Sequence, residues 1–253
     1  MKKNIAIILL SVCLAVTLLV SVALCLYLPY KQTRWRELLW EDYLIWCELI
    51  GCEIDFGKEP EGVPDAYATI RCLYSESFDL SIPRDPLPEK ESYGPSGSYI
   101  YDLFLHPDGT GSLLYQQWGD IYTEVEEGHW TSRSVLFAQS VTALTAEEVE
   151  SVLTVMEESR FQYVTAPDPY VTATDGNTTF IGYSGPIYTD FTDRDHGWSG
   201  HMISSFCAEK GDPCYDIRMA IEALVIAHNA GPFPKAPRRQ VDRRHKQERR
   251  PSI

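Results

Sequence analysis

Residues 99–118 have the sequence YIYDLFLHPDGTGSLLYQQW, which contains the clearest local signal in the chain. Aromatic and branched residues fill 99–106, the turn PDGTG follows, and a second run of the same kind occupies 112–118. Asp108 and Gly109 can adopt left-handed backbone angles at little cost, as a tight reversal between two strands requires. The stretch therefore predicts a β-hairpin and places an antiparallel sheet at the centre of the fold.

Further strand signals lie on both sides of this hairpin. Residues 67–74 alternate as a strand, and the runs 121–125, 129–131 and 135–141 continue an antiparallel meander. Between the first strand and the hairpin, residues 82–97 (IPRDPLPEKESYGPSG) carry four prolines and two glycines, and we expect a long exposed loop there.

Two helices and more extended segments follow the meander. Thr145 and Glu148 have the spacing of a capping box, and four apolar residues then recur on one helical face: Val149, Val152, Leu153 and Met156. Asp212 and Pro213 open a last helix, which ends before Gly231. Its expected apolar side consists of Ile217, Ile221, Leu224, Val225 and His228. Extended segments are expected at 178–183, 187–191 and 201–206.

The amino end predicts a membrane segment. Lys2 and Lys3 precede an uncharged stretch at 5–28, which Pro29 closes. As a helix it spans roughly 36 Å, enough to cross a hydrocarbon core of about 30 Å. A cleaved secretory signal is the alternative, with a cleavage site near Ser21 and Ala23, but the apolar run is long for one. We expect a single-pass anchor in the cell membrane, with the N-terminus inside and the following domain extracytoplasmic.

Residues 33–50 predict an amphipathic helix beyond this segment. Its apolar positions recur at nearly helical spacing before Gly51: Trp35, Leu38, Leu39, Trp46, Leu49 and Ile50. They could lie at the lipid headgroups or pack on the domain, and the acidic residues among them favour packing. The fold class is α+β: an N-terminal transmembrane helix, then an antiparallel β-meander sheet with two or three packed helices. We divide the chain into a signal anchor (1–30), a juxtamembrane helix and linker (31–60), an α+β domain (61–232) and a basic disordered tail (233–253).

The charge distribution bears on partners. The formal net charge is −14, but from Lys235 onward eight Lys or Arg stand against two acidic residues, so residues 1–234 carry −20 and the rest +6. Nucleic acid is not expected as a partner, because an acidic body repels phosphates. Membrane lipid is expected around residues 5–28, and an envelope protein or polymer is a possible further partner. The basic tail could lie on an anionic surface or simply be solvated.

Five of the seven cysteines lie beyond the apolar segment. Cys207 and Cys214 flank a turn and are the best candidates for a disulfide. A bridge between Cys72 and either Cys47 or Cys52 is conceivable. The alternative is that all five are buried thiols.

No residue pattern identifies a catalytic centre or a cofactor, and we expect neither. Three glycine-flanked serines, Ser96, Ser184 and Ser199, lack the spacing of a nucleophile elbow. A flexible acidic loop with Asp190, Asp193 and Asp195 could bind calcium. The alternative to a noncatalytic protein is a membrane-tethered, metal-assisted hydrolase that uses residues 190–201.

Aromatic residues are the remaining candidates for binding. An exposed sheet face could present a platform for carbohydrate or peptide, and the residues proposed for it are Tyr99, Tyr101, Tyr115 and Trp118. Aromatic residues also fit strands for packing reasons alone. The sequence therefore predicts a membrane-anchored, exported α+β domain with a noncatalytic binding or envelope-assembly role and an unidentified ligand.

Overall fold

The computed structural model describes residues 2–52, 66–76, 86–164, 176–188, 191–193 and 198–231. Within these residues, seven strands form one antiparallel sheet in the order β4-β3-β2-β1-β5-β7-β6. The strands are β1 (Ala68–Glu76), β2 (Glu91–Leu105), β3 (Gly111–Glu126), β4 (His129–Leu144), β5 (Asn177–Ser184), β6 (Phe191–Asp193) and β7 (Trp198–Phe206). The helices are α1 (Lys2–Ile50), α2 (Ala146–Glu158) and α3 (Pro213–Ala227), with a 3₁₀ turn, η1, at Phe161–Tyr163. The α+β class expected from the sequence is confirmed.

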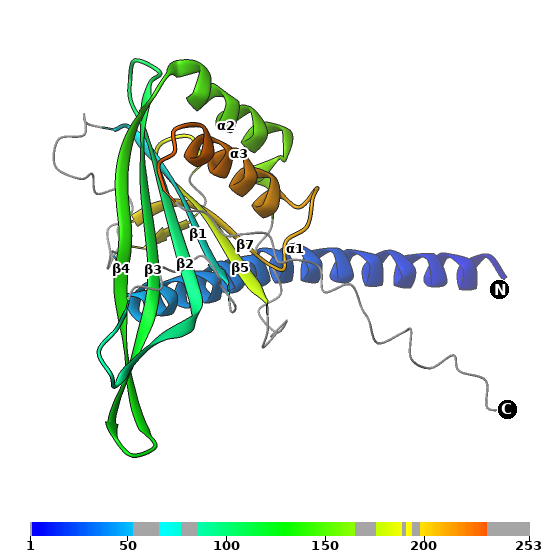
Figure 1. The fold of residues 1–253 in the computed structure, drawn as a ribbon. Helices are drawn as coiled ribbons and strands as arrows, with labels where there is room; N and C mark the ends of the chain where they lie inside the picture. The colour runs from blue at the N-terminus through cyan, green and yellow to red at the C-terminus, as the bar shows by residue number, and fades with distance from the viewer. Residues whose placement is uncertain are drawn as a thin grey trace, which may run out of the picture.

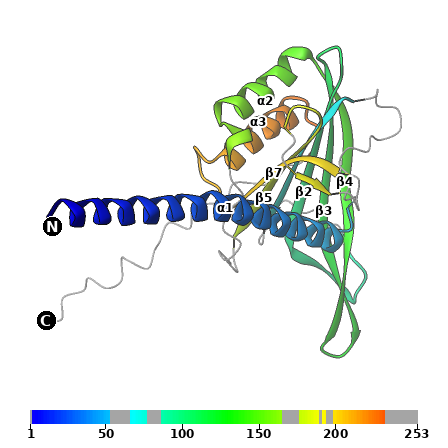
Figure 2. The same cartoon turned by 180° about the vertical axis from the view of Figure 1, so that it is seen from behind.

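The helices lie on the two faces of the sheet. Figure 1 places α2 and α3 together on one face, and Figure 2 shows α1 crossing the other face before it projects away from the domain. Two separate apolar cores result, one under α2 and α3 and one under α1. Alternation along β1 divides its side chains between these cores: Ile70, Cys72 and Tyr74 face α2 and α3, whereas Leu73 faces α1.

The predicted hairpin is confirmed, and its strands are longer than expected. The Asp108 carboxylate accepts hydrogen bonds from the backbone N–H of Thr110, at 2.9 Å, and from the Thr110 hydroxyl, at 2.7 Å. Gly109 has φ +87°, as the turn requires. The expected loop at 82–97 is wrong at its end, because β2 already begins at Glu91. Its register with β3 shifts between Tyr93 and Gly97, and this bulge accommodates Pro95, which has no N–H for a sheet hydrogen bond.

Helices α2 and α3 also follow the prediction. Thr145 and Glu148 form the full capping box at the start of α2. Asp212 caps α3 through a 2.8 Å bond from the backbone N–H of Cys214. His228, expected on the apolar side of α3, is instead exposed at its end. The extended segment expected at 187–191 is wrong at its start, since residues 187–188 form a bend.

The main surprise is that α1 is one continuous helix. The break expected at Pro29 is wrong: the helix runs through it to Ile50. Proline in a helix interior removes one backbone hydrogen bond, but here many turns on both sides maintain the helix. Within the described residues, α1 is the helix that is long and apolar enough to cross a membrane, by length and composition, a test that a signal sequence also passes.

The two halves of α1 have different surroundings. In the first half, the side chains that the structure describes, at 12–28 and at Tyr30, are exposed, for example Leu19 at 70% and Leu26 at 71%. In the second half, five residues on one face are buried against the sheet: Leu39, Trp40, Tyr43, Cys47 and Ile50. The prediction that this segment packs on the domain is confirmed. Burial of each large apolar side chain contributes about 1.5–3 kcal/mol, so this half belongs energetically to the domain.

Candidate functional site

A cavity of about 640 Å³ lies between the last turns of α1 and strands β1 to β4. Its helical wall is largely apolar and comes from Ile45, Trp46, Leu49 and Ile50, with Glu48 beside them. The strands supply Trp118, Gly119 and a polar floor of Ser75, Ser96, Ser98, Asp120, Ser132 and Ser134. A concave site of this volume, with aromatic walls and a few converging polar groups, suits a small-molecule ligand.

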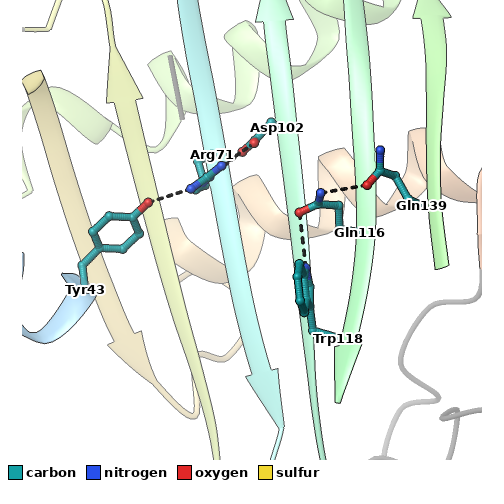
Figure 3. Close-up of polar contacts among 6 residues, drawn as sticks. All are labelled: Tyr43, Arg71, Asp102, Gln116, Trp118 and Gln139. Atoms are coloured by element: carbon teal, nitrogen blue, oxygen red, sulfur yellow. Dashed lines mark hydrogen bonds and ion pairs between the residues drawn. The ribbon is translucent and has the colours of Figure 1, made fainter. Parts of the chain in front are cut away.

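Trp118 is held in place by two glutamines. Its indole N–H donates to Gln116 Oε1 at 3.3 Å, and Gln116 Nε2 donates to Gln139 Oε1 on β4 at 3.1 Å (Figure 3). Gln116 and Gln139 are opposite each other in the β3–β4 register. The indole ring is therefore fixed at the cavity wall by a chain of side-chain hydrogen bonds across three positions of the sheet.

Ser134 connects the helical wall of the cavity to its polar floor through hydrogen bonds. Its Oγ lies 2.7 Å from the Leu49 carbonyl oxygen and 3.0 Å from Asp120 Oδ1, so its hydroxyl can donate to either. The Leu49 carbonyl belongs to the last turn of α1 and needs a partner outside the helix. Nearby, the Ser98 hydroxyl donates to Ser75 Oγ at 3.2 Å. The floor thus offers several hydroxyls and one carboxylate.

A second polar cluster lies under α1. Arg71 Nε and Nη2 donate to the two carboxylate oxygens of Asp102, each at 2.6 Å, and Arg71 Nη1 donates to the Tyr43 hydroxyl oxygen at 2.8 Å (Figure 3). All three side chains are buried. Burial raises the pKa of Tyr43, which keeps its phenol protonated and able to donate. This cluster links the sheet to α1 through a charged pair and a hydroxyl.

The structure corrects the predicted aromatic platform. Tyr99, Tyr101 and Tyr115 are fully buried, so an exposed binding surface made of them is wrong. They lie in the core under α2 and α3, where the Tyr101 hydroxyl donates to Glu222 of α3 at 3.4 Å. Alternation in a strand marks two faces but does not say which is covered, and here helices cover both. Trp118 is part-buried and lines the cavity instead.

The predicted cysteine pairings have different outcomes. Cys207 is exposed just after β7 and Cys214 is buried at the start of α3, each with a free thiol, and their disulfide stays a prediction. A bridge from Cys72 to Cys47 is excluded in this fold, because Cys72 faces α3 and Cys47 faces the opposite side of the sheet.

The predicted calcium loop lies mostly outside the described residues. Asp190 and Asp195 fall there, and Asp193 is the last residue of β6. In the part of the chain that the structure describes, no group of three or more His, Cys, Asp or Glu residues could hold a metal ion. His201, which the hydrolase alternative would use, is buried, and its Nε2 lies 2.9 Å from the Phe161 carbonyl oxygen. Since a carbonyl only accepts, His201 Nε2 carries a proton in this contact.

Sequence reasoning did not identify the cavity or the Arg71 cluster. The cavity forms because the last turn of α1 lies beside strand residues that follow Ile50 by 25 to 84 positions, and no local pattern encodes that approach. The Arg71–Asp102 pair needs the β1–β2 register. The available signal was a single charged residue, Arg71 or Asp102, within each of the largely apolar runs 68–74 and 99–105, because buried charges are usually paired.

Comparison of the chain with protein-family models, with curated proteins and with solved structures finds no match.

Proposed function

We propose that this protein is a membrane-anchored, noncatalytic binding protein whose α+β domain is held outside the membrane by α1. The observation that carries the proposal is the division of α1 into an exposed apolar half and a half packed on the sheet. Because no flexible linker separates the two halves, the anchor would fix the orientation of the domain relative to the bilayer. A cleaved signal would instead remove part of the same helix that supports the sheet.

The membrane part of the proposal is tested in cells. The full-length protein should stay with membranes after extraction at alkaline pH and dissolve only in detergent. A protease added to intact cells or spheroplasts should cut the domain, whereas a cytoplasmic control protein stays whole. Recovery of the uncleaved chain in the aqueous fraction would contradict the anchor, and protection of the domain from the protease would contradict its export.

The cavity suggests the chemical class of the ligand. Its described lining contains the carboxylates of Glu48 and Asp120 and no Lys or Arg, which disfavours an anionic ligand. Trp46 and Trp118 offer flat apolar surfaces, and the serines of the floor offer hydroxyls. These groups match the apolar faces and the hydroxyls of an uncharged saccharide. We infer that the domain binds such a unit of an envelope polymer.

Binding is tested by tryptophan fluorescence of the full-length protein in detergent. N-acetylglucosamine should change the emission in a saturable way, and glucose 6-phosphate should bind less well. Trp118→Phe should lower the response, whereas Trp130→Phe, an exposed position outside the cavity lining, should leave the affinity unchanged. Equal loss in both variants, or no response to any neutral saccharide, would contradict this ligand class.

A further inference from the structure

Two cysteines meet where α1 ends. The backbone N–H of Cys52 bonds to the Cys47 carbonyl at 3.1 Å, and the N–H of Gly51 bonds to the Glu48 carbonyl at 3.2 Å. Gly51 has φ +80°. These features define a Schellman motif, in which the residue three before the helix end and the second residue beyond it come into side-chain contact. Cys47 and Cys52 occupy these two positions, so the turn itself brings their side chains together.

The two thiols contact each other in a polar setting. Cys47 accepts a hydrogen bond from the Cys52 thiol, and the Tyr43 hydroxyl also bonds to Cys47. Tyr43 in turn accepts a bond from Arg71, whose charge Asp102 balances. The hydrogen bond from Cys52 is the largest cause that lowers the pKa of Cys47, and the same bond raises the pKa of Cys52. The hydrogen bond from Cys52, with smaller contributions from Tyr43 and Arg71, thus favours the thiolate of Cys47 against the opposing effect of its burial.

Exposure gives the two sulfurs different roles. Cys47 is fully buried, whereas Cys52 is partly exposed. An external reagent therefore meets Cys52 first, and Cys47 reacts only with its neighbour. Cys72 and Cys214 are buried in the other core and cannot compete for either sulfur.

We propose that Cys47 and Cys52 form a reversible disulfide by exchange with small external disulfides of the glutathione class. Cys52 passes its thiol proton to the hydrogen-bonded Cys47 thiolate and attacks one sulfur of the external disulfide, and the first external thiolate leaves and takes up a proton from solvent. The Cys47 thiolate then attacks Cys52 Sγ, and the second external thiolate leaves and takes the proton that Cys47 has lost. Two electrons pass from the protein to the external disulfide, which becomes two thiols.

The disulfide would close the turn beside the ligand cavity. Leu49 and Ile50, which lie between the two cysteines, line that cavity. Oxidation would therefore fix one cavity wall, and reduction would release it. An oxidising space outside the membrane, where disulfides persist, would favour the closed form. The chemistry itself depends only on the two thiols and can be tested without a membrane or a saccharide.

The test uses the full-length protein in detergent. The reduced protein is equilibrated with oxidised and reduced glutathione at a series of ratios, alkylated and digested with trypsin. Residues 37–58 form one tryptic peptide that contains Cys47, Cys52 and no other cysteine. We expect this peptide to lose the mass of two hydrogens, to resist alkylation in the oxidised range and to recover with dithiothreitol. Full alkylation at every ratio, or linkage of either residue to another cysteine, would overturn the proposal.

Variants test the two roles. Cys47→Ser should trap one glutathione on Cys52, because the second attack is lost, whereas Cys52→Ser should take up none, because Cys47 is buried. Cys207→Ser, an exposed control, should leave the peptide at 37–58 unchanged. Tyr43→Phe should raise the pH at which the pair becomes reactive. Glutathione on Cys52→Ser but not on Cys47→Ser would overturn the proposed order of attack. If a variant does not fold, the loss of two hydrogens from the wild-type peptide 37–58 still tests whether the disulfide forms.

Discussion

Arg71 and Asp102 are direct partners in the β1–β2 register, and their side chains form a buried ion pair with two parallel hydrogen bonds of 2.6 Å. They lie on the face of the sheet that α1 covers, where Arg71 also reaches Tyr43. A charge removed from water needs such complete pairing. The pair therefore fixes the register of two central strands and gives α1 a polar contact that a different register would lose.

Removal of one member of this pair should strongly destabilise the protein. Asp102→Ala leaves the Arg71 guanidinium buried without its counter-ion, and we expect a loss of about 3–5 kcal/mol in the free energy of unfolding. Urea unfolding of the full-length protein in detergent, followed by tryptophan fluorescence, measures this loss. Glu37→Ala, which breaks the exposed Arg34–Glu37 pair, should leave the midpoint nearly unchanged. Similar effects of the two changes would show that Arg71 is not buried.

The Glu148 carboxylate gives a prediction for acid pH. It accepts the Thr145 backbone N–H at 2.9 Å and lies 2.7 Å from His228 Nε2, so it joins the start of α2 to the end of α3. The bond from Thr145, followed by His228, lowers the pKa of Glu148 in the folded protein. A carboxyl with a lowered folded pKa adds stability above its unfolded pKa of about 4.3 and loses it as pH falls through the folded value.

Glu148→Gln should therefore be less stable than the wild type at neutral pH, and the difference should shrink as pH falls below about 4.3. Urea unfolding at a series of pH values measures this convergence. Glu150→Gln, an exposed change on the same helix, is the control and should show a smaller difference at neutral pH. A difference for Glu148→Gln that stays constant down to acid pH would contradict the assigned role.

Local signals in the sequence were sufficient for much of the fold. Two examples are the turn at Asp108 and Gly109 and the capping box of Thr145 and Glu148. Each is made by residues two to three positions apart, so its geometry depends little on the rest of the chain. Features that depend on distant segments were missed. The burial of Tyr99 follows from helices on both faces of the sheet, and the cavity follows from the path of α1 beyond Pro29.

The contact between Cys47 and Cys52 was predictable from local sequence, but the surroundings of the two thiols were only partly so. A helix predicted to end before Gly51, with cysteines at the two contacting positions of a Schellman motif, was a sufficient local signal for their contact. The hydrogen bond from Cys52, the largest cause of the lowered pKa of Cys47, follows from this local contact. The smaller contribution of Arg71 was not readable, because Arg71 reaches this helix only through the folded sheet.

A substitution at Gly51 can separate the effect of this turn on the two thiols from the effect of a general loss of protein stability. Gly51→Ala places a side chain at φ +80° and should cost about 1–2 kcal/mol. Gly128→Ala, at φ +77° in the β3–β4 turn, should cost a similar amount. Only Gly51→Ala should shift the glutathione ratio at which the peptide 37–58 becomes oxidised, because only that turn holds the two cysteines together. An equal shift in both variants would mean that general loosening, and not the Schellman motif, controls the thiols.

The two halves of α1 give the last prediction, since the same substitution can be made in each. Leu39 is buried against the sheet, with 6% of its surface exposed, whereas Leu26 is 71% exposed. Leu39→Ala should lower the free energy of unfolding in detergent by about 2–5 kcal/mol, because it leaves a cavity in the core under α1. Leu26→Ala should change it by less than about 0.5 kcal/mol. A large loss at both positions would mean that the first half of α1 also packs on protein, and the anchor would then need another explanation.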